Sequence, residues 1–213
     1  MSQDDDWTAA AADRMIRETR LAADRLRSSG VQPLGLVPGT YPPMPAHVFF
    51  DSYGPASDRG PGGVVTAVGI RYGDAADPSA TVIDVVSDFT PEFASCCPLE
   101  YELGRAQNEY EAIARGEREI TAPLDAPDGP FGQGTGEILV VGAPQAVAVV
   151  TYGDYRAFRF EVNGVHVTVV SRDETPGVLS FYPITDLTPY LPGALDREEL
   201  RRQLRERRRV IPE

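Results

Sequence analysis

The sequence predicts an α+β fold: a single, largely antiparallel sheet of six to eight strands, with a central helix on one face and peripheral N- and C-terminal helices. Three observations support this prediction. Asn163-Gly164 joins two runs of alternating apolar residues, further short apolar runs are separated by turn-forming residues, and one internal segment has clear helical periodicity. The 20 glycines and 19 prolines among 213 residues are typical of short elements joined by turns.

Residues 1–30 are predicted to form an amphipathic N-terminal helix. Aspartates at 4–6 suit the positively charged start of a helix, and Gly30 ends it. The apolar stripe of this helix consists of Trp7, Ala11, Met15, Ala22 and Leu26. Because the stripe is narrow and alanine-rich, we expect the helix to pack on a surface rather than to fill a core. Residues 31–45 contain five prolines and are expected to form an extended connector.

The core domain is predicted to span residues 46–194 and to begin with three strands. These strands are Ala46–Tyr53, Val64–Tyr72 and Ala80–Ser87. Since turn-rich segments rather than helices separate them, we expect them to pair antiparallel. Further strands are predicted at Glu137–Val141, Ala146–Tyr152 and Val178–Tyr182.

The clearest helix of the core domain begins near Pro98 and ends at Gly116. Its apolar residues recur at helical spacing and are Leu99, Leu103, Ala106, Tyr110 and Ile113. Proline suits the first position of a helix, and two glutamates in the first turn suit its positive end. We expect the apolar face of this helix to dock on the sheet.

The segment around Asn163-Gly164 predicts a β-hairpin with a defined register. Asn-Gly between alternating apolar runs favours a type I′ turn. This turn pairs Val162 with Val165, Phe160 with Val167 and Phe158 with Val169, all on one buried face. On the other face, Glu161 is expected opposite His166, and Arg159 opposite Thr168.

Residues 195–213 are predicted to form a charged C-terminal helix. Asp196 is its cap, Glu199 stands three residues further on, and Leu195 and Leu200 flank the cap as an apolar pair. Beyond Leu204 the segment is almost wholly charged, so we expect the helix to be peripheral. Its arginine-rich end is either solvated or in contact with an acidic partner or RNA.

The charge distribution constrains the partners of the protein. The net charge is −12, and residues 31–194 carry eight arginines against 21 aspartates and glutamates. An acidic body repels the phosphate backbone, so DNA binding is not expected. The charge either serves solubility or attracts a basic partner protein over a long range.

The residue types present exclude several enzyme classes. All 20 basic residues are arginine, so the chain has no lysine for a Schiff base or for a phosphate-binding P-loop. It contains no HExxH motif, no pair of CxxC motifs and no Gly-x-Ser-x-Gly motif. We therefore predict no catalytic residues, no metal and no cofactor, and an enzyme is disfavoured without being excluded.

The sequence favours a cytoplasmic location. Residues 1–6 are acidic where a secretory signal would be basic, and no apolar run reaches the roughly 18 residues of a membrane span. Cys96 and Cys97 are adjacent, and neighbouring Cα atoms lie only about 3.8 Å apart, so a disulfide between them would be strained. Structural thiols and a redox-active pair remain alternatives.

Two residue pairs are the candidate binding residues. Asp84 interrupts an apolar strand, and a buried carboxylate must be paired or have a raised pKa; Arg71 on the preceding strand is the expected partner. Glu161 would favour the charged form of His166, either in a binding site or in an ordinary exposed ion pair. Loop 123–136, rich in glycine and proline, is either a flexible connection or one wall of a pocket.

The leading functional hypothesis is a non-enzymatic, acidic protein-binding module, immunity- or adaptor-like, that engages a basic partner. The alternative is a small-ligand-binding protein or enzyme with a carboxylate/His site between the sheet and loop 123–136. A flat or convex acidic face would indicate the first, and a concave cleft containing Asp84 or His166 the second. The sequence leaves the oligomeric state open.

Overall fold

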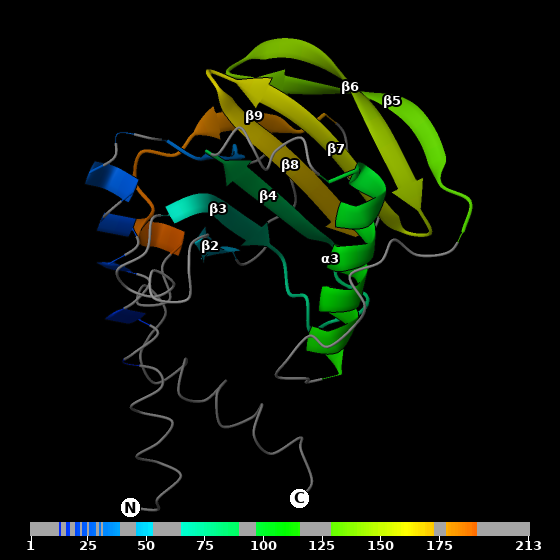
Figure 1. Ribbon diagram of the computed structural model, residues 1–213, viewed down its shortest axis with the longest axis horizontal. Coiled ribbons are helices and arrows are strands. Elements are labelled where there is room, and N and C mark those ends of the chain that lie inside the picture. The colour runs from blue at the N-terminus through cyan, green and yellow to red at the C-terminus, as the bar shows by residue number, and fades with distance from the viewer. Residues whose placement is uncertain are drawn as a thin grey trace, which may run out of the picture.

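A computed structural model describes residues 32–38, 46–52, 65–89, 97–115, 129–172 and 178–190, and scattered positions between 13 and 30 (Figure 1). One nine-stranded sheet dominates, in the order β1-β9-β5-β6-β7-β8-β4-β3-β2. The strands are β1 (Leu34–Leu36), β2 (Ala46–Ser52), β3 (Val65–Tyr72), β4 (Val82–Asp88), β5 (Gly132–Val140), β6 (Ala143–Tyr152), β7 (Tyr155–Val162), β8 (Val165–Arg172) and β9 (Ser180–Pro183). The helical elements with defined bounds are α3 (Leu99–Ala114) and the 3₁₀ turn η1 (Thr188–Tyr190).

The sheet is mixed but mostly antiparallel, as predicted. Only β5 and β9 run parallel; every other neighbouring pair is antiparallel. Eight strands have four residues or more, within the predicted range, and the three-residue β1 is a ninth. The sheet therefore begins earlier than the predicted boundary at residue 46, because β1 lies inside the segment interpreted as a connector. Extended, proline-rich backbone is already close to strand geometry, and here it pairs with β9.

The sheet curves until its two ends approach each other (Figure 1). Its end strand β1 is bonded to side chains of β3 and β4, which lie near the other end of the strand order. The Leu34 N–H donates to Ser87 Oγ at 2.9 Å, and the Leu36 N–H donates to Tyr72 Oη at 2.9 Å. The curved sheet thus encloses a core on its inner face.

The Asn163-Gly164 hairpin forms the centre of this fold in the predicted register. β7 and β8 pair Val162 with Val165, Phe160 with Val167 and Phe158 with Val169. All six side chains belong to the inner core or pack against it. Asn163 and Gly164 have φ angles of 52° and 77°, the left-handed conformation that a type I′ turn requires.

Helix α3 covers the outer face of the sheet and forms a second, smaller core. Its Leu103, Ala106 and Tyr110 pack with side chains of β4, β6, β7 and β8, namely Val82, Val150, Tyr155, Ala157 and Val170. The predicted docking face of the helix is therefore confirmed. Pro98 is the N-cap residue rather than the first helical residue, because its ψ of 153° is extended.

The N-terminal helix is less peripheral than predicted. Two other predictions concern residues that the structure does not describe. Described positions from 13 to 28 are helical, and Ala23 and Leu26 are buried in the inner core. The predicted C-terminal helix at 195–213 and Cys96 lie outside the described residues. Among the helices of the described segments, none is both long and apolar enough to cross a membrane.

The interpretation of residues 123–136 as a loop is wrong for 132–136. β5 begins at Gly132 and pairs with β6 through nine consecutive residue pairs, whereas residues 123–128 lie outside the described part. β6 also begins earlier than predicted, at Ala143, and includes Pro144. Proline is tolerated there because the pairing of β6 with β7 starts only at Val149, so no ladder bond requires its missing N–H.

Candidate functional site

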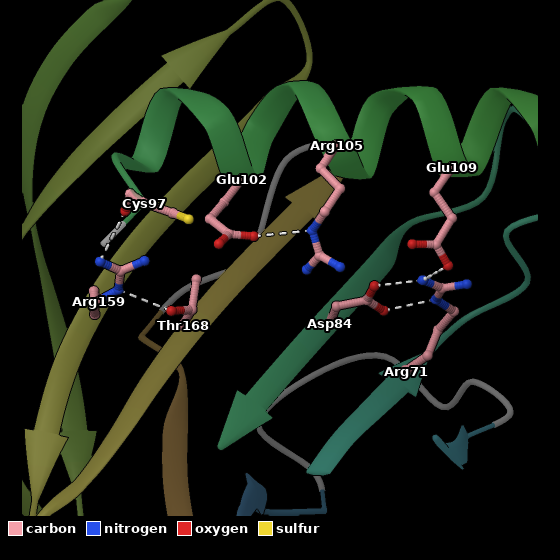
Figure 2. A network of polar contacts seen from close by, with 8 residues as sticks. All are labelled: Arg71, Asp84, Cys97, Glu102, Arg105, Glu109, Arg159 and Thr168. Atoms are coloured by element: carbon pink, nitrogen blue, oxygen red, sulfur yellow. Dashed lines mark hydrogen bonds and ion pairs between the residues drawn. The ribbon is translucent and has the colours of Figure 1, made fainter. Parts of the chain in front are cut away.

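The predicted pair Arg71–Asp84 lies beneath α3, on the outer face of β3 and β4. The Arg71 side chain donates from Nε to Asp84 Oδ1 at 2.8 Å and from Nη2 to Asp84 Oδ2 at 2.6 Å. Nη2 also donates to Glu109 Oε1 on α3 at 2.7 Å (Figure 2). The Arg71 and Asp84 side chains are only 6% and 9% exposed. The charge of the Asp84 carboxylate is therefore balanced within the fold.

Tyr110 on α3 lies between two arginines. The guanidinium carbons of Arg71 and Arg172 are 4.9 and 5.5 Å from the centre of its ring, which is cation–π geometry. Its hydroxyl is buried and makes no hydrogen bond within the described residues. Burial raises the pKa of Tyr110 well above its usual value, and the negative charge of Asp84 acts in the same direction. The phenol is held neutral.

Arg159 and Arg172 attach neighbouring segments to the sheet. Arg172 donates to the backbone carbonyls of Asp77 and Ala80 in the connection between β3 and β4. Arg159 donates to Thr168 Oγ1 at 2.9 Å and to the Cys97 carbonyl at 3.1 Å, just before α3 begins (Figure 2). Together with Arg71, these arginines hold the helix and a loop on the outer face. Their charges serve the fold.

The second predicted pair, Glu161 and His166, also forms across β7 and β8. His166 Nδ1 lies 3.7 Å from Glu161 Oε2, and the two side chains are 27% and 58% exposed. Asp84 is paired with Val170 of β8, four residues from His166, which corresponds to about 13 Å along a strand. The structure thus places the two pairs on one face of the sheet but does not bring them together.

Three open depressions lie among the described residues, and neither Arg71 nor Asp84 lines any of these three. One of about 350 Å³ lies beside the Asn163-Gly164 turn, and one of about 100 Å³ lies beside the N-terminal helix. The third, also about 350 Å³, is here called the α3 groove. It is lined by Pro78, Gln107, Glu111, Ala114, Tyr152, Gly153, Asp154, Tyr155 and Arg172.

The α3 groove combines aromatic rings with exposed carboxylates. Tyr152 and Tyr155 flank the turn between β6 and β7, and Glu111 and Asp154 are exposed at the rim. Burial raises the pKa of Tyr155, although the nearby Arg172 opposes this shift. Sequence reasoning did not identify this groove, because its walls come from four separate segments: the connection between β3 and β4, helix α3, the turn between β6 and β7, and the end of β8. Its local signal is the sequence Tyr152-Gly153-Asp154-Tyr155, which carries no chemical motif.

The described side chains distribute positive and negative charge unequally between interior and surface. Of the nine arginines whose burial is described, Arg71 and Arg172 are buried and Arg159 is half-buried, as are Arg105 and Arg156; the exposed ones are Arg17, Arg20, Arg27 and Arg115. Among the carboxylates whose burial is described, only Asp84 is buried. The exposed acidic residues of the described segments are Asp24, Asp74, Asp77, Glu111, Glu137, Asp154, Glu161 and Asp186. Exposed carboxylates therefore outnumber exposed arginines by eight to four in the described part of the chain.

The described segments contain no group of three or more His, Cys, Asp or Glu side chains arranged to hold a metal ion. In comparisons with known proteins, the chain matches no family model, no curated protein and no solved structure.

Proposed function

We propose that this protein is a non-enzymatic binding module that engages a basic partner protein. The observation that carries the proposal is the excess of negative charge at the surface: among the described residues, eight carboxylates but only four arginines are exposed. A surface with an excess of one sign steers an oppositely charged partner and disfavours like-charged ones.

The geometry of the predicted site residues gives less support to an enzyme. Asp84 accepts two hydrogen bonds from Arg71 and lines none of the three depressions described above, so it is poorly placed to meet a substrate. His166 lies on the same sheet face in an exposed pair with Glu161. A catalytic site requires such groups to converge on one concave position, and these two pairs lie apart.

The α3 groove suits a cationic side chain of the partner. Tyrosine rings attract ammonium and guanidinium groups, and the rim carboxylates of Glu111 and Asp154 add charge attraction. Glu111 forms an exposed ion pair with Arg115 at 3.5 Å, and Arg172 also lines the groove but donates to the backbone carbonyl of Ala80. Asp154 is thus the rim carboxylate without an ion pair among the described residues. We therefore expect an arginine or lysine of the partner to contact this groove.

The proposal can be tested by partner capture followed by a matched pair of double variants. Immobilised full-length protein is incubated with an extract of its source cells at low and high salt, and retained proteins are identified by mass spectrometry. We expect a basic protein that is retained at low salt and released at high salt, because screening weakens attraction between exposed charges.

Binding of the purified partner then locates the contact. The double variant Glu111→Gln/Asp154→Asn is expected to weaken binding by about tenfold. Asp24→Asn/Asp186→Asn removes the same number of exposed charges away from the groove and is expected to change binding by less than about twofold. Recovery of the chain with a tightly held small molecule, or with an acidic partner whose retention ignores salt, would overturn the proposal.

A further inference from the structure

Among the described residues, the edge of β5 that faces away from β6 is unpaired along most of its length. On one side β5 pairs with β6 without a register shift, from Gly132 opposite Thr151 to Val140 opposite Ala143. On the other side, β9 pairs with β5 only at Leu139 and Val140. Residues 132–135 are exposed. Within the described residues, the part of β5 before Leu139 therefore has no neighbouring strand on that side.

The direction of the backbone groups along this edge follows from two hydrogen bonds. The Leu139 N–H donates to the Leu179 carbonyl, and the Val141 N–H donates to the Phe181 carbonyl, each at 2.9 Å. Successive residues of a strand alternate the side on which their backbone groups point. Gln133, Thr135 and Glu137 therefore direct their N–H and C=O groups away from β6. None of these groups has a backbone partner in the described segments.

We propose that an extended segment of the basic partner adds to this edge of β5 as a further strand. The inference rests on the proposed function and specifies how the partner is held. An unpaired sheet edge offers a row of donors and acceptors, and strand addition satisfies them on both chains.

The two faces of β5 define the chemistry of the added segment. On one face, Gly134 leaves open space, because a Cβ there would meet nothing within 4 Å, whereas the side chains of Thr151 and Val149 lie 2.3 and 3.1 Å from the positions of a Cβ at Gly132 and Gly136. Large apolar side chains of the partner can occupy this space and reach the valines of β6. On the other face, the exposed Glu137 favours arginine or lysine. The segment we infer alternates apolar and basic residues.

A second copy of this chain is a poorer occupant of the same edge. Each copy carries a net charge of −12, so two copies repel each other. Two glycine-lined faces meeting at the edge would also leave the space beside Val149 unfilled. A basic segment with large side chains meets neither difficulty.

The test uses the full-length protein and a labelled, end-blocked octapeptide of alternating valine and arginine. Residue 135 directs its backbone groups to the open edge, so Thr135→Pro removes one outward N–H and leaves the hydrogen bonds between β5 and β6 in place. Proline is tolerated on such strand edges. Thr135→Val is the matched control, because it changes the side chain and keeps the N–H. We expect the proline variant to bind about tenfold more weakly and the valine variant to stay within about twofold of the original protein.

A second measurement does not depend on any variant. Binding of the octapeptide is expected to slow hydrogen exchange at the amides of Gln133, Thr135 and Glu137. An octapeptide N-methylated at alternate backbone nitrogens, which cannot complete the ladder, is expected to give no such protection.

The outcomes separate this inference from the proposed function. Salt-sensitive peptide binding that Thr135→Pro leaves unchanged, with no protection along β5, would overturn strand addition while the basic-partner function stands. Absence of binding to any basic peptide or captured basic protein would overturn both. A concentration-dependent dimer that Thr135→Pro abolishes would assign the edge to a second copy and overturn the choice of occupant.

Discussion

Arg71 connects three elements through one side chain. It donates to Asp84 on β4 and to Glu109 on α3, and it lies over the ring of Tyr110. Burial alone would lower the pKa of Arg71, but the hydrogen bonds and negative charge of Asp84, together with Glu109, outweigh it and raise the pKa. The guanidinium is therefore charged at every pH at which the protein folds. A buried charge of this kind is tolerated only while its partners remain.

Removing Asp84 is expected to cost far more stability than removing a carboxylate from a more exposed pair. Asp84→Ala removes the carboxylate that accepts two hydrogen bonds from the buried guanidinium, and breaking such a pair costs about 3–5 kcal/mol in the free energy of unfolding. Glu102→Ala breaks the pair with Arg105, whose side chain is 38% exposed, and is expected to cost less than about 1 kcal/mol. Urea denaturation monitored by circular dichroism measures both values. Equal losses in the two variants would show that the Arg71 network does not stabilise the fold.

At the scale of elements, the hairpin formed by β5 and β6 has an unusual turn. Val141 and Gly142 have φ angles of 50° and 80°, close to the 52° and 77° of Asn163 and Gly164. Asparagine and glycine adopt this left-handed conformation readily, whereas a β-branched residue is strained in it by about 1–2 kcal/mol. The two hairpins thus have the same turn geometry, but Asn163 suits the first position of the turn whereas Val141 is strained there.

Replacing the strained valine is expected to stabilise the protein. Val141 is 51% exposed, so Val141→Asn loses little buried surface and should raise the free energy of unfolding by about 1 kcal/mol. Val178 is 42% exposed and has no positive φ, so Val178→Asn is the control and should bring no gain. Thermal and urea unfolding of both variants provide the comparison. A stability change of the same sign and size in both would indicate that turn strain is not the cause.

These two hairpins also show why the sequence predicts some elements and not others. Asn163-Gly164 carries both a turn signature and flanking alternation, so its register could be derived residue by residue. In β5 the alternating positions are glycines, which hide the apolar pattern, and Val141-Gly142 lacks the preferred first residue of the turn. The short β1 is similarly hidden, because its neighbouring prolines suggest a connector and its pairing with β9 is a contact distant in sequence.

In the candidate site, too, the sequence predicts contacts that local patterns determine and not those that depend on distant segments. Arg71 and Asp84 could be paired from the sequence because they lie on adjacent strands of one antiparallel unit. Glu109 and Tyr110 could not be added, since the position of a helix on a sheet depends on packing over the whole outer face. The α3 groove was equally inaccessible, because a loop, a helix, a turn and the end of strand β8 from distant parts of the chain form it.

At the scale of the whole molecule, closure of the curved sheet depends on β1. This strand lies close to the far end of the sheet: a Cβ at Gly35 would lie 2.7 Å from Tyr72 Oη and 2.9 Å from the side chain of Ile184. Only glycine fits between these groups without displacement. The hydrogen bond from the Leu36 N–H to Tyr72 Oη is one of those that join the two ends of the sheet.

Tyr72→Phe therefore tests closure with little change in packing. The ring of Tyr72, fully buried and in edge contact with Tyr190, is retained, but the buried N–H of Leu36 loses its acceptor. An unsatisfied buried donor costs about 1–3 kcal/mol, so the free energy of unfolding should fall by that amount. If β1 is the closing element, hydrogen exchange should accelerate at its amides and at β9 more than along β7 and β8. Tyr182→Phe, at a side chain that is 41% exposed, should change neither quantity. Uniform acceleration across the sheet would instead mean that β1 opens only with the whole fold.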